Sequence, residues 1–158
     1  MTTVYREYSA INMAITISKR SKNDAYDLSE IDRIIFNGSF KEQDFIDYSD
    51  NPIYHFAVAK IDEKVVGYIG FMTICGESDI INVGVLPEFR GRGIGNELLS
   101  YMINDCKKNG VTCVHLEVRK SNKVAISLYE KFGFIATGVS KNHYKEPTED
   151  AIRMSVTF

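Results

Sequence analysis

Three glycines alternate with two arginines in the middle of the chain. Gly91, Gly93 and Gly95 stand at every second position, with Arg90 and Arg92 between and before them. Glycine lets a ligand approach the backbone closely, and arginine suits phosphate oxygens. An alternating apolar run precedes the loop, and an amphipathic run follows it. A strand, a glycine loop and a helix N-terminus in this order offer free N–H groups and a positive dipole end, which predicts a phosphate or pyrophosphate site.

Other phosphate-binding loops match the segment Val83–Gly95 less well. A P-loop ends in Gly-Lys-Ser/Thr, which is missing here. A dinucleotide fingerprint reads G-x-G-x-x-G, whereas this loop reads G-x-G-x-G. The plain alternative is a glycine-rich turn with solvated arginines. We favour a ligand site because both flanking elements match the geometry of an anion site.

The residues around the loop predict the elements that position it. Ile80–Leu86 is expected to be the strand that enters the loop, and the helix after it carries apolar residues at four-residue steps from Ile94 to Cys106. A strand over Thr112–Val118 follows. Ser121 or Asn122 then caps a second helix, in which Ala125, Leu128, Tyr129 and Phe132 share one side.

The rest of the chain reads as further strands and helices of the same sheet. The expected strands are Met13–Ser18, Ile53–Ile61, Val65–Cys75, Phe134–Thr137 and Ala151–Phe158, the expected helices run from Asn23 or Asp24 to Asn37 and over Lys41–Tyr48, and a polar connector covers Ser140–Asp150. The two strands joined by a tight turn after Ile61 must pair antiparallel. This order predicts one α/β domain over residues 1–158, a mixed, mostly antiparallel sheet with helices on both faces.

Composition excludes several functional classes. The net charge of −2 argues against a general nucleic-acid or membrane-surface binder, and 44% apolar with 25% charged residues is typical of a globular domain. No apolar run is long enough to span a bilayer. Residues 1–10 read as a loose leader without the apolar core of a signal peptide, so we expect a cytoplasmic protein.

The cysteines and histidines do not show the spacing of metal ligands. Cys75, Cys106 and Cys113 are widely separated, and the three histidines form no H-E-x-x-H motif. We therefore expect no metal, and reduced, mostly buried thiols.

The spacing Arg90-x-x-Gly93-x-Gly95 resembles the acyl-CoA pyrophosphate loop of the GNAT superfamily of N-acetyltransferases, whose pattern is Arg/Gln-x-x-Gly-x-Gly/Ala. Two later blocks, LEVRKSNKVAISLYEKFGF (Leu116–Phe134) and KNHYKEPTEDAIRM (Lys141–Met154), are similar to the RimI branch of bacterial N-terminal-alanine acetyltransferases, which modify a small-subunit ribosomal protein. The resemblance covers the chain from about Ile81 onward. It implies the GNAT fold, acetyl-CoA as cosubstrate and a protein N-terminus as acceptor.

The resemblance also implies where acetyl-CoA binds. In GNAT folds the strand before the loop is splayed from its neighbour, so its backbone pairs with the pantetheine amides, and the Val85 N–H would polarise the thioester carbonyl. The implied cosubstrate-binding residues are Val83, Val85, Arg90, Gly91, Arg92, Gly93, Ile94, Gly95 and Asn122. From the residues alone, the two valine side chains are ordinary core and Asn122 is a helix cap.

Glu117 is the candidate general base. Val114, Leu116 and Val118 alternate onto one apolar face, so Glu117 must point to the other. Alternation alone favours a solvated carboxylate that pairs with Arg119 or a lysine. The resemblance favours the base, because the matching glutamate of RimI-type enzymes takes up the proton of the amine.

Tyr129 is the candidate general acid. It lies on the apolar stripe of its helix, so its residue pattern is equally typical of a core tyrosine with a satisfied hydroxyl. A phenol keeps its proton at neutral pH and can donate it to a departing thiolate. The matching tyrosine of the resembled family does so, and we therefore expect catalysis.

The resemblance leaves the acceptor open at one position. RimI-like tails read Asn-Tyr-Tyr where this chain has Asn142, His143 and Tyr144, so peptide selectivity can differ. A histidine in the cleft would help to deprotonate the amine, and a solvated loop histidine is an equally good interpretation. The alternatives to N-terminal acetylation are transfer to a lysine or small amine and, from a different class, a non-catalytic acyl-CoA sensor. The sequence does not indicate the oligomeric state.

Overall fold

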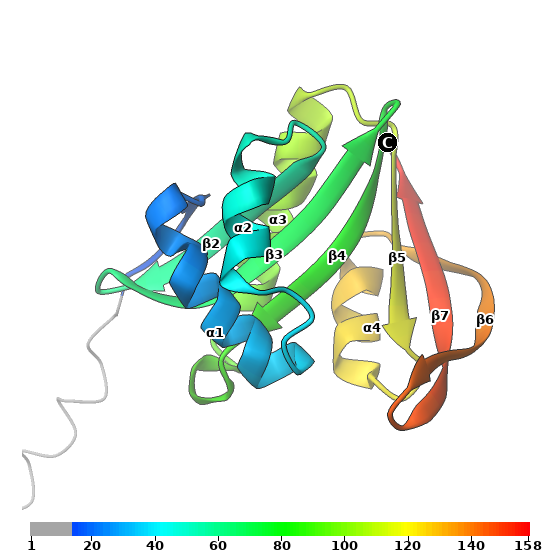
Figure 1. Ribbon diagram of the computed structural model, residues 1–158. Coiled ribbons are helices and arrows are strands. Elements are labelled where there is room, and N and C mark those ends of the chain that lie inside the picture. Colours follow the sequence, from blue (N-terminus) through cyan, green and yellow to red (C-terminus); the bar gives the residue numbers. More distant parts are fainter. Residues whose placement is uncertain (1–13) are drawn as a thin grey trace, which may run out of the picture.

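The structure is a computed structural model that describes residues 14–158. Its strands form one seven-stranded sheet in the order β1-β2-β3-β4-β5-β7-β6 (Figure 1). The strands are β1 (Ile15–Lys19), β2 (Tyr54–Ile61), β3 (Lys64–Ile74), β4 (Glu77–Val85), β5 (Cys113–Arg119), β6 (Ile135–Lys145) and β7 (Thr148–Thr157). The α-helices are α1 (Ala25–Phe36), α2 (Glu42–Asp47), α3 (Ile94–Lys108) and α4 (Lys123–Lys131). The predicted leader, residues 1–10, and Met13 lie outside the described residues.

The sheet is antiparallel except at its centre. β1 to β4 pair antiparallel in sequence order, and β7 pairs antiparallel with both β5 and β6. The parallel pair β4–β5 joins only Glu77–Asp79 to Cys113–His115. Beyond these residues the two strands diverge, as Figure 1 shows below the end marked C. The predicted mixed, mostly antiparallel sheet is confirmed, with a break in pairing between β4 and β5.

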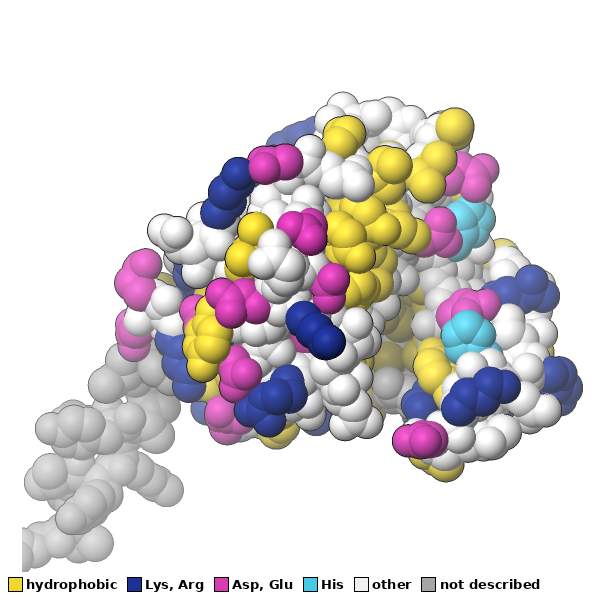
Figure 2. Space-filling view, in the orientation of Figure 1, with side chains coloured by type: hydrophobic (Ala, Val, Ile, Leu, Met, Phe, Trp, Pro, Cys, Tyr) yellow, Lys and Arg dark blue, Asp and Glu magenta, His cyan; other side chains and the backbone are white. Residues whose placement is uncertain are grey.

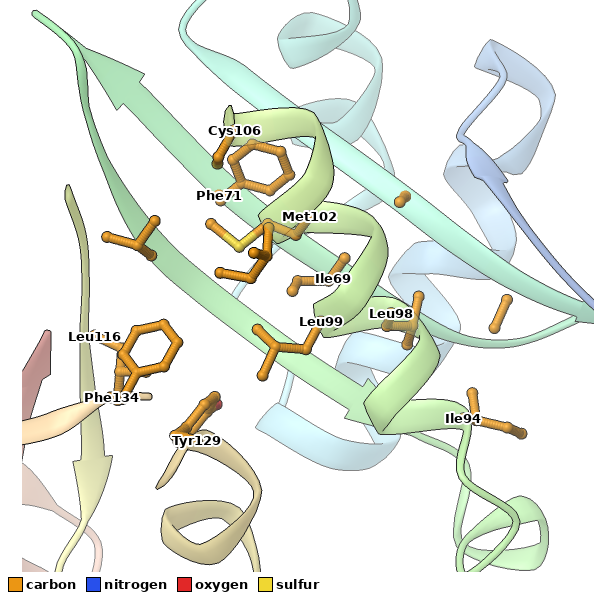
Figure 3. Packing of buried hydrophobic residues seen from close by; sticks show 14 of the residues in the cluster. Ile69, Phe71, Ile94, Leu98, Leu99, Met102, Cys106, Leu116, Tyr129 and Phe134 are labelled. Carbon is orange, nitrogen blue, oxygen red and sulfur yellow. The ribbon is translucent and has the colours of Figure 1, made fainter. Parts of the chain in front are cut away.

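Helices cover both faces of the sheet, as the sequence predicts. On one face α1 and α2 pack on the side chains of Phe56, Val58 and Tyr68. On the other face the buried side of α3, from Ile94 to Cys106, packs on Ile69 and Phe71 (Figure 3). Successive residues of β2 and β3 thus point to opposite faces of the sheet, and each face contributes to a different core. Burial of each large apolar side chain contributes about 1.5–3 kcal/mol, so the two layers hold the central strands in place.

The end of the chain differs from the prediction. Ser140–Asp150, expected as a polar connector, forms parts of β6 and β7 and the turn between them. Most side chains of β6 are exposed, because β6 is the edge strand of the sheet. Without a buried face the segment has no apolar alternation, so its pattern is that of a loop.

Two smaller expectations need correction. Asp24 occupies the N-cap position of α1 but makes no capping hydrogen bond there, because its carboxylate accepts the Ser21 N–H at 2.7 Å and pairs with Lys60 at 2.8 Å. Of the three cysteines only Cys106 is buried, so the prediction of mostly buried thiols is wrong. Between residues 14 and 158 no helix is long and apolar enough to cross a membrane.

Candidate active site

One edge of β4 has no strand partner beyond Asp79. The Leu86 N–H donates to the Val66 carbonyl of β3 at 2.9 Å. Because hydrogen bonding alternates along an antiparallel pair, Val83 and Val85 direct their N–H and C=O groups away from β3, into the gap toward β5. Their side chains pack against the α3 core. The gap therefore exposes backbone groups that can pair with an extended ligand.

The glycine loop opens the N-terminus of α3 to the outside. Gly91 and Gly93 have φ of 75° and 80°, a left-handed conformation that favours glycine. In the described part of the chain, apart from the neighbouring residues, no atom lies within 4 Å of the place where a Cβ would stand at either residue, and no side chain there caps α3. The first-turn N–H groups of α3 are thus uncapped, which fits a pyrophosphate group in front of the loop.

The two loop arginines contact backbone carbonyls, and Arg92 also lies over the Phe89 ring, 5.4 Å from its centroid. The Arg90 Nε–H donates to the Val85 carbonyl at 2.9 Å, and Arg92 donates to the Glu88 carbonyl at 3.4 Å. Neither guanidinium has a carboxylate within 4.0 Å in the described part of the chain. Their positive charge is therefore available to an anion beside the α3 N-terminus.

Glu117 points from β5 to the face opposite the α3 core. The buried side chains of Val114, Leu116 and Val118 alternate with it, as predicted. Its Oε1 accepts the Ser140 hydroxyl at 2.9 Å, and its Oε2 lies 2.9 Å from His143 Nε2. Between residues 14 and 158, Glu117 does not form the pairing with Arg119 or a lysine that alternation alone suggests.

Arg119 is instead held by the β6–β7 hairpin. Its guanidinium lies 3.5 Å from the Glu149 carboxylate and 4.1 Å from the ring centroid of Tyr144. Glu149 also accepts the Ser121 N–H at 2.6 Å, which lowers the pKa of Glu149, and the Ser121 hydroxyl and Arg119 act in the same direction. These contacts tie the start of α4 to β5 and the hairpin.

A cavity of about 450 Å³ opens on the face of Glu117. Figure 2 shows this face: an apolar hollow runs down its middle, and histidine and acidic side chains gather on one rim. The cavity joins residues of β4 to residues of β5, β6 and β7. Its lining includes Asp79, Ile81, His115, Glu117, His143 and Arg153.

Tyr129 lies on the other face, in the α3 core. Its side chain is 8% exposed and packs against Phe134, with ring centroids 5.7 Å apart (Figure 3). Burial, with a smaller contribution from Tyr144, raises the pKa of Tyr129 to about 12. Within residues 14–158 its hydroxyl makes no hydrogen bond to another side chain or to the backbone, and it is not among the fully buried unpaired polar atoms, so it reaches the molecular surface.

Tyr144 lies within electrostatic reach of both candidate catalytic groups. Burial raises the pKa of Tyr144, Arg119 lowers it, and Glu117 raises it again. Tyr144 in turn raises the pKa of Tyr129. Glu117, which lines the cavity, and Tyr129, which lies in the α3 core, are therefore on opposite faces of the sheet, and both interact electrostatically with Tyr144.

Asn122 caps α4. Its Oδ1 accepts the Ala125 N–H at 3.1 Å, which confirms the helix cap inferred from the residues. This bond leaves the side-chain amide nitrogen free of recorded partners among residues 14–158, and it points to no particular ligand by itself.

Sequence reasoning did not identify Ser140 and Glu149 as parts of the site, whereas the resemblance placed Tyr144, with His143, near the acceptor peptide. All three belong to the β6–β7 hairpin, which the sequence presents as a polar connector. The similarity of the block Lys141–Met154 to a known family was the available signal. Between residues 14 and 158 no cluster of histidine, cysteine and acidic residues is arranged to hold a metal ion.

Comparison with known proteins agrees with this geometry. Residues 25–134 match the acetyltransferase (GNAT) family. A putative [ribosomal protein bS18]-alanine N-acetyltransferase of Bacillus subtilis is 34% identical over 82% of this chain and 86% of its own length. The N-alpha-acetyltransferase RimI of Mycobacterium tuberculosis is 31% identical over 89% of this chain and 90% of its own.

A solved structure shows the same fold. The ribosomal-protein-S18-alanine N-acetyltransferase of Escherichia coli superimposes with a TM-score of 0.83 and 28% identity, over 91% of this chain and 94% of that one. The family match spans the diverging strands β4 and β5, the glycine loop between them, Glu117 and Tyr129. This chain belongs to the GNAT family of acetyltransferases.

Proposed function

We propose that this acetyltransferase moves the acetyl group of acetyl-CoA to the α-amine of a protein N-terminus by direct attack in a ternary complex. The acceptor we propose is the N-terminal alanine of a small-subunit ribosomal protein, which places the enzyme in the cytoplasm. One observation carries the chemistry: the gap between β4 and β5 has Glu117 on one face and Tyr129 on the other.

The donor occupies the gap and the glycine loop. Arg90, Arg92 and the backbone of Gly91–Gly95 hold the pyrophosphate at the N-terminus of α3. The pantetheine arm pairs with the outward backbone groups of Val83 and Val85 and passes Asn122. The Val85 carbonyl already accepts the Arg90 Nε–H, whereas its N–H is directed into the gap, where it can polarise the thioester carbonyl.

Glu117 and Tyr129 then carry out the two proton transfers of the reaction. Glu117 takes a proton from the attacking amine, directly or through one water, as the C–N bond forms. An α-amine has a reference pKa of about 7.7–8.0, so a carboxylate in the cleft is a sufficient base. As the C–S bond breaks, Tyr129 protonates the departing thiolate, and its raised pKa ensures that its proton is present at neutral pH.

The similar proteins support the proposed acceptor. Two of the similar proteins are described as [ribosomal protein bS18]-alanine N-acetyltransferases. The cavity beside Glu117 is open to solvent on the side away from the α3 core, so a chain end can reach the gap from there.

Mass spectrometry of peptides incubated with the protein and acetyl-CoA tests this proposal. One set carries free Ala, Ser or Met N-termini, and the other is N-blocked and contains lysine. We expect acetylation of the free set, with Ala preferred. Modification of the blocked set alone contradicts N-terminal transfer, and acetyl-CoA binding without any modification indicates a sensor.

A further inference from the structure

His143 contacts the carboxylate that we propose as the base. Its Nε2 lies 2.9 Å from Glu117 Oε2, with side chains 42% and 35% exposed. A carboxylate only accepts hydrogen bonds, so Nε2 carries the proton in this contact. The Ser140 hydroxyl donates to the other oxygen, Oε1, at 2.9 Å. Both oxygens of Glu117 are thus held from β6, the neighbour of β7.

A bulge in β6 brings His143 to this position. Ser140 pairs with Ala151 and Tyr144 with Glu149, so the three residues between Ser140 and Tyr144 face Asp150 alone. An insertion of this kind bends a strand and redirects its side chains, and bulges are common beside active sites. The bulge therefore turns the side chain of His143 toward β5.

Asp150 fixes the bulge from β7. Its Oδ1 accepts the Asn142 N–H at 2.9 Å, and its Oδ2 pairs with Lys141 at 3.0 Å. The Asn142 N–H, followed by Lys141, lowers the pKa of Asp150. Asn142 adopts φ of 51°, a left-handed conformation that asparagine tolerates better than most residues. The geometry at His143 is thus supported from β7 through Asp150.

The neighbouring cations do not compete for Glu117. Arg119, on the same strand, is bound by Glu149 and stacks on Tyr144. Arg153 pairs with Glu117 in the β5–β7 register and lines the same cavity, but it makes no ion pair with Glu117 in the described chain. His143 and Ser140 are therefore the groups that orient the carboxylate.

We propose that His143 is a positioning residue for Glu117. The proposal rests on the proposed acetyl transfer but holds for any acceptor amine. Each carboxylate oxygen has two lone-pair sites, and His143 and Ser140 use one on each oxygen. The remaining sites are left for the proton of the amine, so His143 fixes the direction in which Glu117 receives it. His143 neither gains nor loses a proton in this role.

Two substitutions separate this role from ring packing. His143 lies edge-on to Tyr144, with ring centroids 4.8 Å apart. His143→Phe keeps a ring at this place and removes the donor, whereas His143→Gln keeps an N–H donor and removes the ring. With the acceptor peptide that the wild-type enzyme prefers, we expect kcat to fall about 10-fold in His143→Phe and to stay within about 3-fold in His143→Gln. The KM for acetyl-CoA should not change.

Combination with Glu117→Gln gives a second readout. If His143 acts through Glu117, His143→Phe should slow a Glu117→Gln enzyme by far less than 10-fold, because the two losses are not additive. His55→Phe is the matched control, since His55 lies on β2, lines a different cavity and stacks on Phe71 at 5.0 Å. Its kcat should equal that of the wild type.

The opposite order of the two variants would overturn the proposal. Activity retained by His143→Phe and lost by His143→Gln would assign the ring a packing role, and fully additive losses would separate His143 from Glu117. Failure of the N-terminal acceptor changes which peptide is modified, but not the ratio between variants. Failure of acetyl transfer altogether appears already in the wild type.

Nitrogen NMR of histidine tests the contact without any turnover. In the wild type, His143 should carry a slowly exchanging proton on Nε2. Glu117→Ala removes the acceptor and should speed this exchange. Unchanged exchange would show that the contact with Glu117 does not hold the imidazole.

Discussion

At the scale of single residues, Tyr129 offers a direct test of the proposed chemistry. Its side chain is 8% exposed and its hydroxyl makes no hydrogen bond within residues 14–158, so Tyr129→Phe leaves no other group of that part of the chain unsatisfied. We expect kcat to fall about 100-fold, typical of a lost general acid, while the Kd for acetyl-CoA stays unchanged. Steady-state kinetics and calorimetry measure the two quantities. An unchanged kcat would show that Tyr129 is a packing residue of the core and not the general acid.

Glu117→Gln tests the base in the same way. The glutamine oxygen can still accept the His143 N–H, and its NH2 group can donate to the Ser140 hydroxyl, so the hairpin should stay in place. A glutamine cannot take a proton from the amine, and we expect kcat to fall about 100-fold or more with acetyl-CoA binding preserved. If kcat survives, the proton leaves by another route and the role proposed for His143 falls with it.

The face of Glu117 could be predicted, but its partners could not. Strict alternation from Val114 to Val118 fixes the side on which Glu117 lies. Ser140 and His143 are more than twenty residues away and belong to a strand whose pairing skips three residues. No local pattern encodes such a contact, because it depends on the register between distant strands.

At the scale of elements, the glycine loop and α3 act together as the proposed pyrophosphate site. Gly93→Ala introduces a Cβ at φ of 80° and directs it into the open space before α3. The strained backbone should lower the free energy of unfolding by about 1–2 kcal/mol. We expect the KM for acetyl-CoA to rise about 10-fold, with a smaller change in kcat.

Gly110 provides the matched control for this prediction. It follows the other end of α3, has φ of 74° and also has open space around it. Gly110→Ala should lower the free energy of unfolding by a similar amount and leave the KM unchanged. Equal KM values for the two variants would mean that backbone strain, not lost ligand contact, explains the result.

Helix α1 is attached to the sheet by a buried carboxylate. Asp32 is fully buried and accepts hydrogen bonds from the Tyr68 hydroxyl at 2.8 Å, the Phe40 N–H at 2.9 Å and Asn82 at 3.2 Å. Asp32→Ala leaves these donors without an acceptor and should lower the free energy of unfolding by about 3 kcal/mol, measured by urea unfolding. Glu30→Ala, at an exposed position of α1, should have a much smaller effect.

The helices were easier to predict than the last two strands. α1, α3 and α4 each bury one side, so apolar residues recur with the helical period. β6 is an exposed edge strand interrupted by a bulge, and neither feature leaves a periodic signal. The element that the sequence described least well is the one that supplies Ser140, His143 and Tyr144 to the site.

At the scale of the whole molecule, the active site follows from the order of the strands. β4 and β5 are parallel, so the chain must cross between them, and α3 makes this crossover on one face. The strands pair at their beginnings and separate toward their ends, where the glycine loop and α4 begin. The sequence indicates the order of elements, but the length of the β4–β5 pairing depends on how both cores pack, which no single segment determines.

The burial of one tyrosine in each of the two cores predicts how the stability of the protein changes at alkaline pH. Tyr68 is buried in the α1 core and Tyr129 in the α3 core. Burial, assisted by Asp32, raises the pKa of Tyr68 against a smaller effect of Asn82, and burial raises the pKa of Tyr129 to about 12. In the unfolded chain both tyrosines release their protons near pH 10. Above that pH the unfolded state holds fewer protons than the folded state, so stability falls as the pH rises.

Urea unfolding between pH 8 and pH 11.5 measures this effect. We expect a constant free energy of unfolding up to about pH 9.5 and then a decline approaching about 1.4 kcal/mol per pH unit for each buried tyrosine. Tyr129→Phe and Tyr68→Phe should each flatten the decline, whereas Tyr26→Phe, at a position 59% exposed, should not. If the free energy of unfolding of Tyr129→Phe declines with pH as steeply as that of the wild type, the Tyr129 phenol ionises as readily in the folded state as in the unfolded chain. The folded protein would then not hold Tyr129 in the protonated form that the proposed proton transfer to the thiolate requires.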